Sequence, residues 1–116
     1  MIDLLVLEKK DSLGNCTIAD KVDLPIISVK GDVNIKEGVI FRNFVYDYIE
    51  KKNTNFAIHM DVSTVGSTVI SSLIEIYKVC KDKNLQFIVT YPKEKENMYE
   101  PLNLCGISDL ITTYPI

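Results

Sequence analysis

Asn55 to Asn84, with the sequence NFAIHMDVSTVGSTVISSLIEIYKVCKDKN, is the stretch that decides the fold. Its apolar beginning, Asn55 to Val62, predicts a buried strand, and the amphipathic part from Ser67 to Lys83 predicts a helix. The residues expected to point inward from that helix are Ile70, Leu73, Ile74, Tyr77 and Cys80. Between the strand and the helix lies a turn of glycine and hydroxyl residues, where the first backbone amides of the helix have no partner within it. We therefore expect the functional site at this junction.

The segments that flank this stretch continue the alternation of strands and helices. Upstream, Lys36 to Lys52 predicts a helix that Asn34 caps. The apolar face expected for this helix consists of Val39, Ile40, Phe44, Val45, Tyr48 and Ile49. Downstream, Leu85 to Thr90 predicts a strand, which ends at Tyr91-Pro92 because proline has no backbone N–H to donate to a sheet.

The N-terminal part of the chain predicts a pair of strands. Ile2 to Leu7 and Ile26 to Val29 are short, rich in β-branched and aliphatic residues, and bounded by charged or turn residues. We expect them to pair as a hairpin-like layer. Between them, Ser12 to Asn15 is typical of a turn, and Cys16 to Ala19 predicts a further short strand.

The C-terminal part predicts one more helix and one more strand. Lys93 to Cys105 is expected to be helical, with Pro101 starting a new turn or kinking the helix, and Gly106 closing it in a left-handed conformation. Ser108 to Ile111 then leads into a last short strand. The order β-β-α-β-α-β-α-β predicts an α/β fold in which residues 1–116 form a single domain, with a mixed sheet, parallel at its centre, backed by three to four helices.

Length and charge exclude several classes of protein. With 116 residues, 47% of them apolar, the chain is long enough for one hydrophobic core and too short for two domains. The net charge is −3 and the longest basic runs are the pairs Lys9-Lys10 and Lys51-Lys52, so neither nucleic acid nor an anionic lipid surface is expected as a partner. The apolar run at Ile2 to Leu7 is interrupted by Asp3, which favours a strand over a signal peptide, and no stretch is long enough to insert into a membrane.

The cysteines indicate a reducing compartment. Cys16, Cys80 and Cys105 are an odd number, and no two of them have the Cys-x-x-Cys spacing of a redox or zinc motif. We expect buried, reduced thiols, a cytoplasmic location and no metal site.

No group in the sequence stands out as catalytic. His59, the lone histidine, lies in a predicted buried strand without a matching nucleophile, so we expect a hydrogen-bonded sheet histidine and not a general base. Asp61 is expected to hold the following loop by accepting from backbone amides. The charged run from Lys93 to Glu96 is expected to be a solvated first helical turn. The five glycines form no phosphate-binding loop, so an intrinsic nucleotide hydrolase is not expected. We predict neither an enzymatic activity nor a cofactor.

Three short motifs occur in order along the chain. These are Gly31-Asp32-Val33-Asn34, then Asp61-Val62-Ser63 followed by Gly66-Ser67-Thr68-Val69-Ile70, and finally Cys105-Gly106-Ile107-Ser108-Asp109-Leu110-Ile111. They resemble the Gly-Glu-Leu-Asp turn, the Asp-Leu-Ser strand end with the Asp-Ser-Ser-Gly-Leu helix start, and the Ser-Gly-Leu-x-x-Leu-Phe ending of the STAS domain. That domain is the module of anti-sigma factor antagonists and of stress-signalling scaffolds. The resemblance covers nearly the whole chain.

The resemblance leaves two registers for the family's phosphoacceptor serine. Counting back from Lys83-Asn84 places Ser67 on the acceptor, with Gly66 where the family has an aspartate. Counting forward from Asp61 places Ile70 on the acceptor and Ser71 just after it, which removes the phosphorylation switch and shortens the helix. We favour the first register because it preserves the apolar face of the helix. Asn34 also replaces the aspartate of the first motif.

The resemblance implies a regulatory protein-binding module, controlled by serine phosphorylation at the start of the second helix. Its implied partner is an anti-sigma factor or a switch-kinase-like protein. The phosphoacceptor is then Ser67, with Thr68 and Ser71 as alternatives. The residues expected to contact the partner are Asp32, Asn34, Asp61, Ser63, Gly66, Ser67, Thr68 and Ser71.

Several alternatives stay open at this point. Ser67 is also a suitable N-cap, a role that needs no phosphorylation. A second hypothesis is a phosphorylation-independent scaffold, or a subunit of a stress-sensing or lipid-transport assembly. A third hypothesis is a small flavodoxin-like domain, which predicts a ligand at the carboxyl ends of the parallel strands. The sequence leaves the oligomeric state open.

Overall fold

A five-stranded mixed sheet forms the frame of the molecule. The computed structural model describes residues 2–7 and 24–116. Its strands lie side by side in chain order: β1 (Ile2–Leu7), β2 (Ile26–Gly31), β3 (Phe56–Val62), β4 (Phe87–Tyr91) and β5 (Thr112–Pro115). β1 is antiparallel to β2, and the other neighbours are parallel. This topology confirms the predicted mixed sheet with a parallel centre and the pairing of the two N-terminal strands. The turn at Ser12 to Asn15 and the strand at Cys16 to Ala19 lie outside the described residues.

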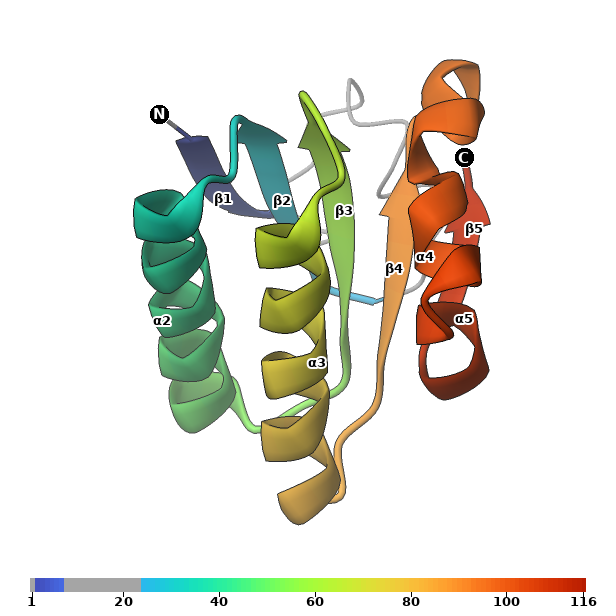
Figure 1. Cartoon of the computed structure of the whole chain (residues 1–116). Helices are drawn as coiled ribbons and strands as arrows, with labels where there is room; N and C mark the ends of the chain where they lie inside the picture. Colours follow the sequence, from blue (N-terminus) through green and yellow to red (C-terminus); the bar gives the residue numbers. More distant parts are fainter. Residues whose placement is uncertain (1, 8–23) are drawn as a thin grey trace.

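One face of the sheet carries the helices. α2 (Ile35–Lys52) and α3 (Ser67–Asp82) lie next to each other, and α4 (Glu100–Leu104) and α5 (Ile107–Leu110) continue the same layer (Figure 1). A 3-10 helix, η2 (Lys93–Tyr99), connects β4 to α4. Both long helices start at the same end of the molecule, because each follows the carboxyl end of a parallel strand (Figure 1).

β3 is buried on both sides, as its apolar run predicts. Phe56, Ile58, Met60 and Val62 belong to the main core beneath the helices. The alternating residue Ala57 packs with Ile26 in a second, smaller cluster. Since successive side chains of a strand point to opposite faces, this second cluster lies on the side of the sheet away from the helices.

The buried face of α2 differs from the predicted one. Its inward side chains are Phe41, Val45, Tyr48 and Ile49. Val39 and Ile40 were predicted to point inward and are each 44% exposed, so that prediction is wrong. Phe44 is half-buried. The helix turns Gly38 and Phe41 toward its neighbours, and the helical period then carries the two aliphatic residues onto the solvent side.

The buried face of α3 is also rotated from the predicted one. Leu73 and Cys80 point inward as expected, together with Val69, Ser72 and Ile76, whereas Ile70, Ile74 and Tyr77 are only half-buried. Apolar residues cover more than half of the circumference of this helix. The sequence period therefore does not determine the centre of the buried stripe, and packing against α2 and the sheet does.

The C-terminal part contains three short helical segments and not the predicted single helix. The 3-10 helix has a non-helical residue, Lys95, with φ −108°. Pro101 lies in the first turn of α4, where its missing N–H costs least, which confirms that it starts a new turn. Gly106 is left-handed, with φ 79°, as predicted, and the last strand follows α5.

Candidate functional site

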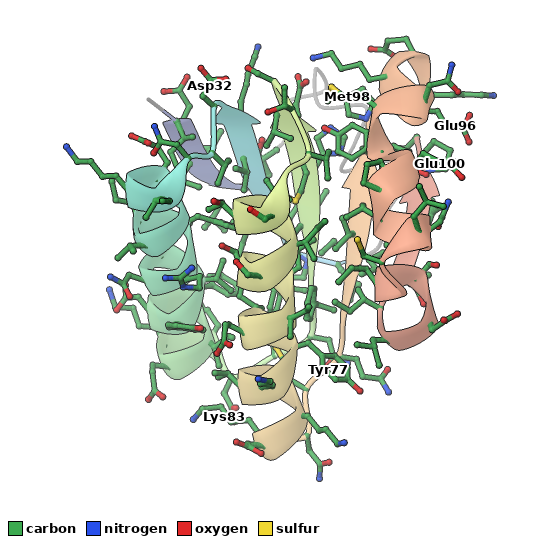
Figure 2. All side chains as sticks on the ribbon, in the orientation of Figure 1. Asp32, Tyr77, Lys83, Glu96, Met98 and Glu100 are labelled. Carbon is green, nitrogen blue, oxygen red and sulfur yellow. The ribbon has the colours of Figure 1, made fainter. Side chains whose placement is uncertain are left out.

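The loop after β2 and the loop after β3 lie together at one edge of the sheet. Lys30 pairs with Asp61, and Gly31 pairs with Val62. One residue further on, the Ser63 N–H donates to the Gly31 carbonyl at 2.9 Å. The first two sequence motifs therefore lie side by side, although they are about 30 residues apart in the chain. Figure 2 shows Asp32 at this end of the molecule and Lys83 at the opposite end of α3.

The loop after β2 starts α2 with a side-chain cap. Asn34 has an extended backbone, and its Oδ1 accepts from the Glu37 N–H at 3.2 Å. This confirms the predicted N-cap. Asp32 and Asn34 are exposed, so both are accessible from solvent.

The loop after β3 starts α3 without a side-chain cap. The helix begins at Ser67, as predicted, but the N-cap residue is Gly66, which has no side chain to accept from the first amides. The interpretation of Ser67 as the N-cap is therefore wrong. Ser67 is exposed, and the first turn of α3 contains no acidic residue. The partial positive charge at the start of this helix is thus uncompensated by an acidic side chain of its first turn.

We predict that Gly66→Asp stabilises the protein. Gly66 has an extended backbone (φ −115°), and a Cβ added there meets no atom within 4 Å. An aspartate would accept from an amide of the first turn and place its charge at the helix N-terminus, for a gain of about 0.5 to 1 kcal/mol in the free energy of unfolding. Urea denaturation measures this gain. Gly66→Ala, which cannot cap, is the control, and an aspartate variant no more stable than the alanine variant would contradict the prediction.

The other hydroxyl residues at the start of α3 differ in accessibility. Thr68 is half-buried against α2: a Cβ added at Gly38 would lie 2.5 Å from Thr68 Cγ2. Ser71 is exposed, and its Oγ donates to the Thr68 carbonyl at 3.2 Å. Ser72 is buried and accepts from Arg42 Nη1 at 3.2 Å. Ser67 and Ser71 are therefore the exposed serines of the first two turns.

Asp61, at the end of β3, contacts η2. Its Oδ1 lies 2.7 Å from Lys95 Nζ, and among the described residues this ion pair replaces the backbone amides that we expected to contact Asp61. The run from Lys93 to Glu96 is consequently not a purely solvated turn. Ser63, the next predicted site residue, is exposed.

Tyr99 is the residue of this region that the sequence does not single out. It is only 2% exposed and lies stacked on Tyr91, with ring centroids 4.5 Å apart. Its hydroxyl accepts from the Val62 N–H at 3.1 Å and donates to the Met60 carbonyl. Burial raises the pKa of Tyr99 to about 12, so the hydroxyl keeps its proton near neutral pH. One feature of the sequence points to Tyr99: it follows Pro92, the residue at which the chain leaves the sheet.

His59, Cys80 and Cys105 are the histidine and the thiols that the structure describes. His59 is buried on the sheet, with Nδ1 2.8 Å from Thr90 Oγ1, which confirms the expected hydrogen-bonded histidine. Burial lowers its pKa, so the ring is neutral near pH 7. Cys80 is buried, and burial raises the pKa of its thiol to about 11. Cys105 is exposed, which contradicts its predicted burial, and Cys16 lies outside the described residues.

A cavity of about 420 Å³ opens at the other end of the molecule. Its lining includes the last turn of α3 and the first residues of β4 and β5, among them Lys81, Phe87 and Thr112. It therefore lies at the amino ends of these strands, whereas the flavodoxin-like hypothesis expects a ligand at their carboxyl ends.

In residues 2–7 and 24–116, no three His, Cys, Asp or Glu side chains are grouped to hold a metal ion. The helices of that part of the chain are too short or too polar to cross a membrane.

Comparison with known proteins gives a family and a fold. The family model of the STAS domain matches residues 17–116. The crystal structure of an anti-sigma factor antagonist from Mycobacterium paratuberculosis has a TM-score of 0.74 to this structure. The sequences are 17% identical, and the match covers 100% of this chain and 87% of that one. No curated protein matches the sequence significantly.

Proposed function

Because this chain belongs to the STAS domain family, we propose that it is a regulatory protein-binding module of the anti-sigma factor antagonist type, controlled by phosphorylation of Ser67. The observation that carries the proposal is the position of Ser67: exposed, at the first residue of a 16-residue helix whose N-terminus has no capping side chain. A phosphate there is accessible to a kinase and adds charge at the end of the helix that favours it.

The proposed switch acts through surface charge. Phosphorylation adds about −1.5 to −2 charges at neutral pH, to a chain whose net charge is already −3. The site is at a helix start and away from the core, so the fold does not need to change. A partner that buries dephosphorylated Ser67 would have to desolvate the phosphate without a matching cation, which costs several kcal/mol.

The proposed partner surface is the edge formed by the loops after β2 and β3. Its exposed members are Asp32, Asn34, Ser63, Gly66, Ser67 and Ser71. Asp61 and Thr68 lie at its border, since Asp61 pairs with Lys95 and Thr68 faces α2. The partner we propose is an anti-sigma factor or a switch-kinase-like protein, and the chain itself acts by binding and not by catalysis. The free thiols of Cys80 and Cys105 are consistent with action in the cytoplasm.

One observation favours a second candidate function. Gly66 and Asn34 stand where the family has carboxylates, and the first turn of α3 has no acidic residue. A kinase that recognises those carboxylates would not act on this chain. The chain would then be a phosphorylation-independent scaffold, or a subunit of a stress-sensing or lipid-transport assembly.

Phosphate mapping combined with partner capture tests the proposal. We expect the tagged protein, expressed in its native host, to carry phosphate on Ser67 under some growth conditions, as located by mass spectrometry. The unphosphorylated fraction is expected to retain a protein partner that the phosphorylated fraction lacks. Phosphate on Ser71 alone would make Ser71 the acceptor in place of Ser67. A partner retained with no phosphate on Ser67, Thr68 or Ser71 under any condition would favour the scaffold.

A further inference from the structure

β3 continues past the last residue of its pairing with β4. The parallel pairing of β3 with β4 runs from Phe56–Phe87 to His59–Thr90, and continuing this register places Pro92 opposite Asp61. In a parallel pair, the residue opposite Asp61 would donate its N–H to the Met60 carbonyl and accept from the Val62 N–H. Proline has no N–H and cannot make the first of these bonds. The Pro92 carbonyl, which would accept the second bond, accepts instead from the Lys95 N–H at 3.0 Å. Two backbone groups at the end of β3, the Met60 carbonyl and the Val62 N–H, therefore need another partner.

The Tyr99 hydroxyl makes both bonds. It accepts from the Val62 N–H at 3.1 Å and donates to the Met60 carbonyl at 2.5 Å, which are the two bonds of the missing strand residue. Stacking on Tyr91 and nearly complete burial hold the ring in place. Asp61 lies between Met60 and Val62 and forms an ion pair with Lys95. Lys95 belongs to η2, the same 3-10 helix as Tyr99.

We infer that Tyr99 is a positioning residue for the loop that presents Ser67, because its hydroxyl takes the place of a strand partner at the point where β3 leaves the sheet. The loop of residues 63–66 starts directly after Val62 and leads into Ser67. On the other side of β3, this region is held by the bond from the Ser63 N–H to Gly31. Removing the Tyr99 hydroxyl would therefore leave the end of β3 paired on one side only. Tyr99 would hold the loop whether or not Ser67 is phosphorylated. Its effect on a phosphorylation switch rests on the proposed function.

Hydrogen exchange of backbone amides in Tyr99→Phe tests this inference. The variant keeps the stacked ring and removes both hydrogen bonds. We expect the amides of Val62 and of residues 63–66 to exchange about tenfold faster or more, because buried backbone groups lose their partner. The amides of α2 between Phe41 and Ile49 serve as the internal control. Their exchange is expected to change only as far as the variant changes the global stability of the protein.

Two further variants make the result specific. Tyr91→Phe removes a hydroxyl from the other member of the stacked pair and leaves the β3 bonds intact, so its loop amides should exchange as in the unmodified protein. Lys95→Gln breaks the ion pair with Asp61 and should accelerate exchange at the same amides to a smaller extent. It also provides the test if Tyr99→Phe fails to fold.

The outcomes separate this inference from the proposed function. Equal acceleration throughout the domain, or unchanged exchange at residues 62–66, would overturn the positioning role. Local acceleration in Tyr99→Phe supports it even if the protein captures no partner in either state of Ser67, and that second result would refute only the proposed function. Local acceleration together with weaker partner binding supports both.

Discussion

Ser67→Asp is expected to weaken binding to the captured partner by about a hundredfold or more, with no loss in the free energy of unfolding. The carboxylate stands for the phosphate at an exposed position of the proposed interface. Burying an unpaired charge costs about 3 kcal/mol or more, which corresponds to this factor in the dissociation constant. In the free protein the same carboxylate lies at the start of α3, where the helix dipole favours it by about 0.3 to 1 kcal/mol. Calorimetric titration and thermal unfolding measure the two quantities.

Two control variants assign the effect to charge at this position. Ser67→Asn introduces a neutral side chain of similar size and is expected to bind nearly as well as serine. Ser71→Asp adds the same charge to an exposed residue one turn further along α3, and we expect a smaller loss of affinity. A larger loss for Ser71→Asp than for Ser67→Asp would assign the switch to Ser71, the alternative acceptor. Equal affinity for all variants would rule out a charge switch at this edge.

Gly38→Ala is expected to destabilise the protein by about 1 to 3 kcal/mol, although alanine is the better helix former. The added Cβ would lie 2.5 Å from Thr68 Cγ2 and 3.4 Å from Ser72 Oγ, both on α3. Thr68 is β-branched, so its methyl group has few alternative rotamers in a helix. α2 would have to move away from α3, which disturbs the core beneath both helices. Urea denaturation gives the change in the free energy of unfolding.

Thr68→Ser provides the matched test of this contact. The change removes only the methyl group that a new Cβ would meet, at an expected cost of about 1 kcal/mol. In this background Gly38→Ala is expected to be neutral or slightly stabilising, since the clash is gone and the helix propensity remains. The two changes should therefore couple strongly in a double-mutant cycle. An equal cost of Gly38→Ala in both backgrounds would show that the close contact between the helices is not the cause.

Local patterns in the sequence were sufficient for most of the element order. The buried run of β3, the Asn34 cap of α2, the start of α3 at Ser67 and the left-handed Gly106 all depend on neighbouring residues in the chain. Such features follow from propensity, capping and periodicity, which act over a few residues. The mixed sheet then follows from the order of its elements, because helical crossovers join parallel strands.

Features that depend on residues distant in the chain were predicted less well. The apolar residues of α2 and α3 extend around more than one side of each helix, so Val39 and Ile40 were placed inward although they are exposed. Instead, α2 turns Gly38 toward Thr68 of α3, where a side chain at position 38 would have no room. The N-cap role assigned to Ser67 was wrong by one residue, because the backbone of Gly66 is the last extended one before the helix.

The sequence by itself determined the order of the strands and the two long helices, and that Ser67 stands where a strand passes into a helix. Only the tertiary structure decided what holds that junction. Tyr99 reaches Met60 and Val62 across 37 to 39 positions of the chain, and Lys95 reaches Asp61 across 34. These contacts arise because Pro92 ends strand pairing before β3 ends, and the register that produces this mismatch exists only once the sheet has formed.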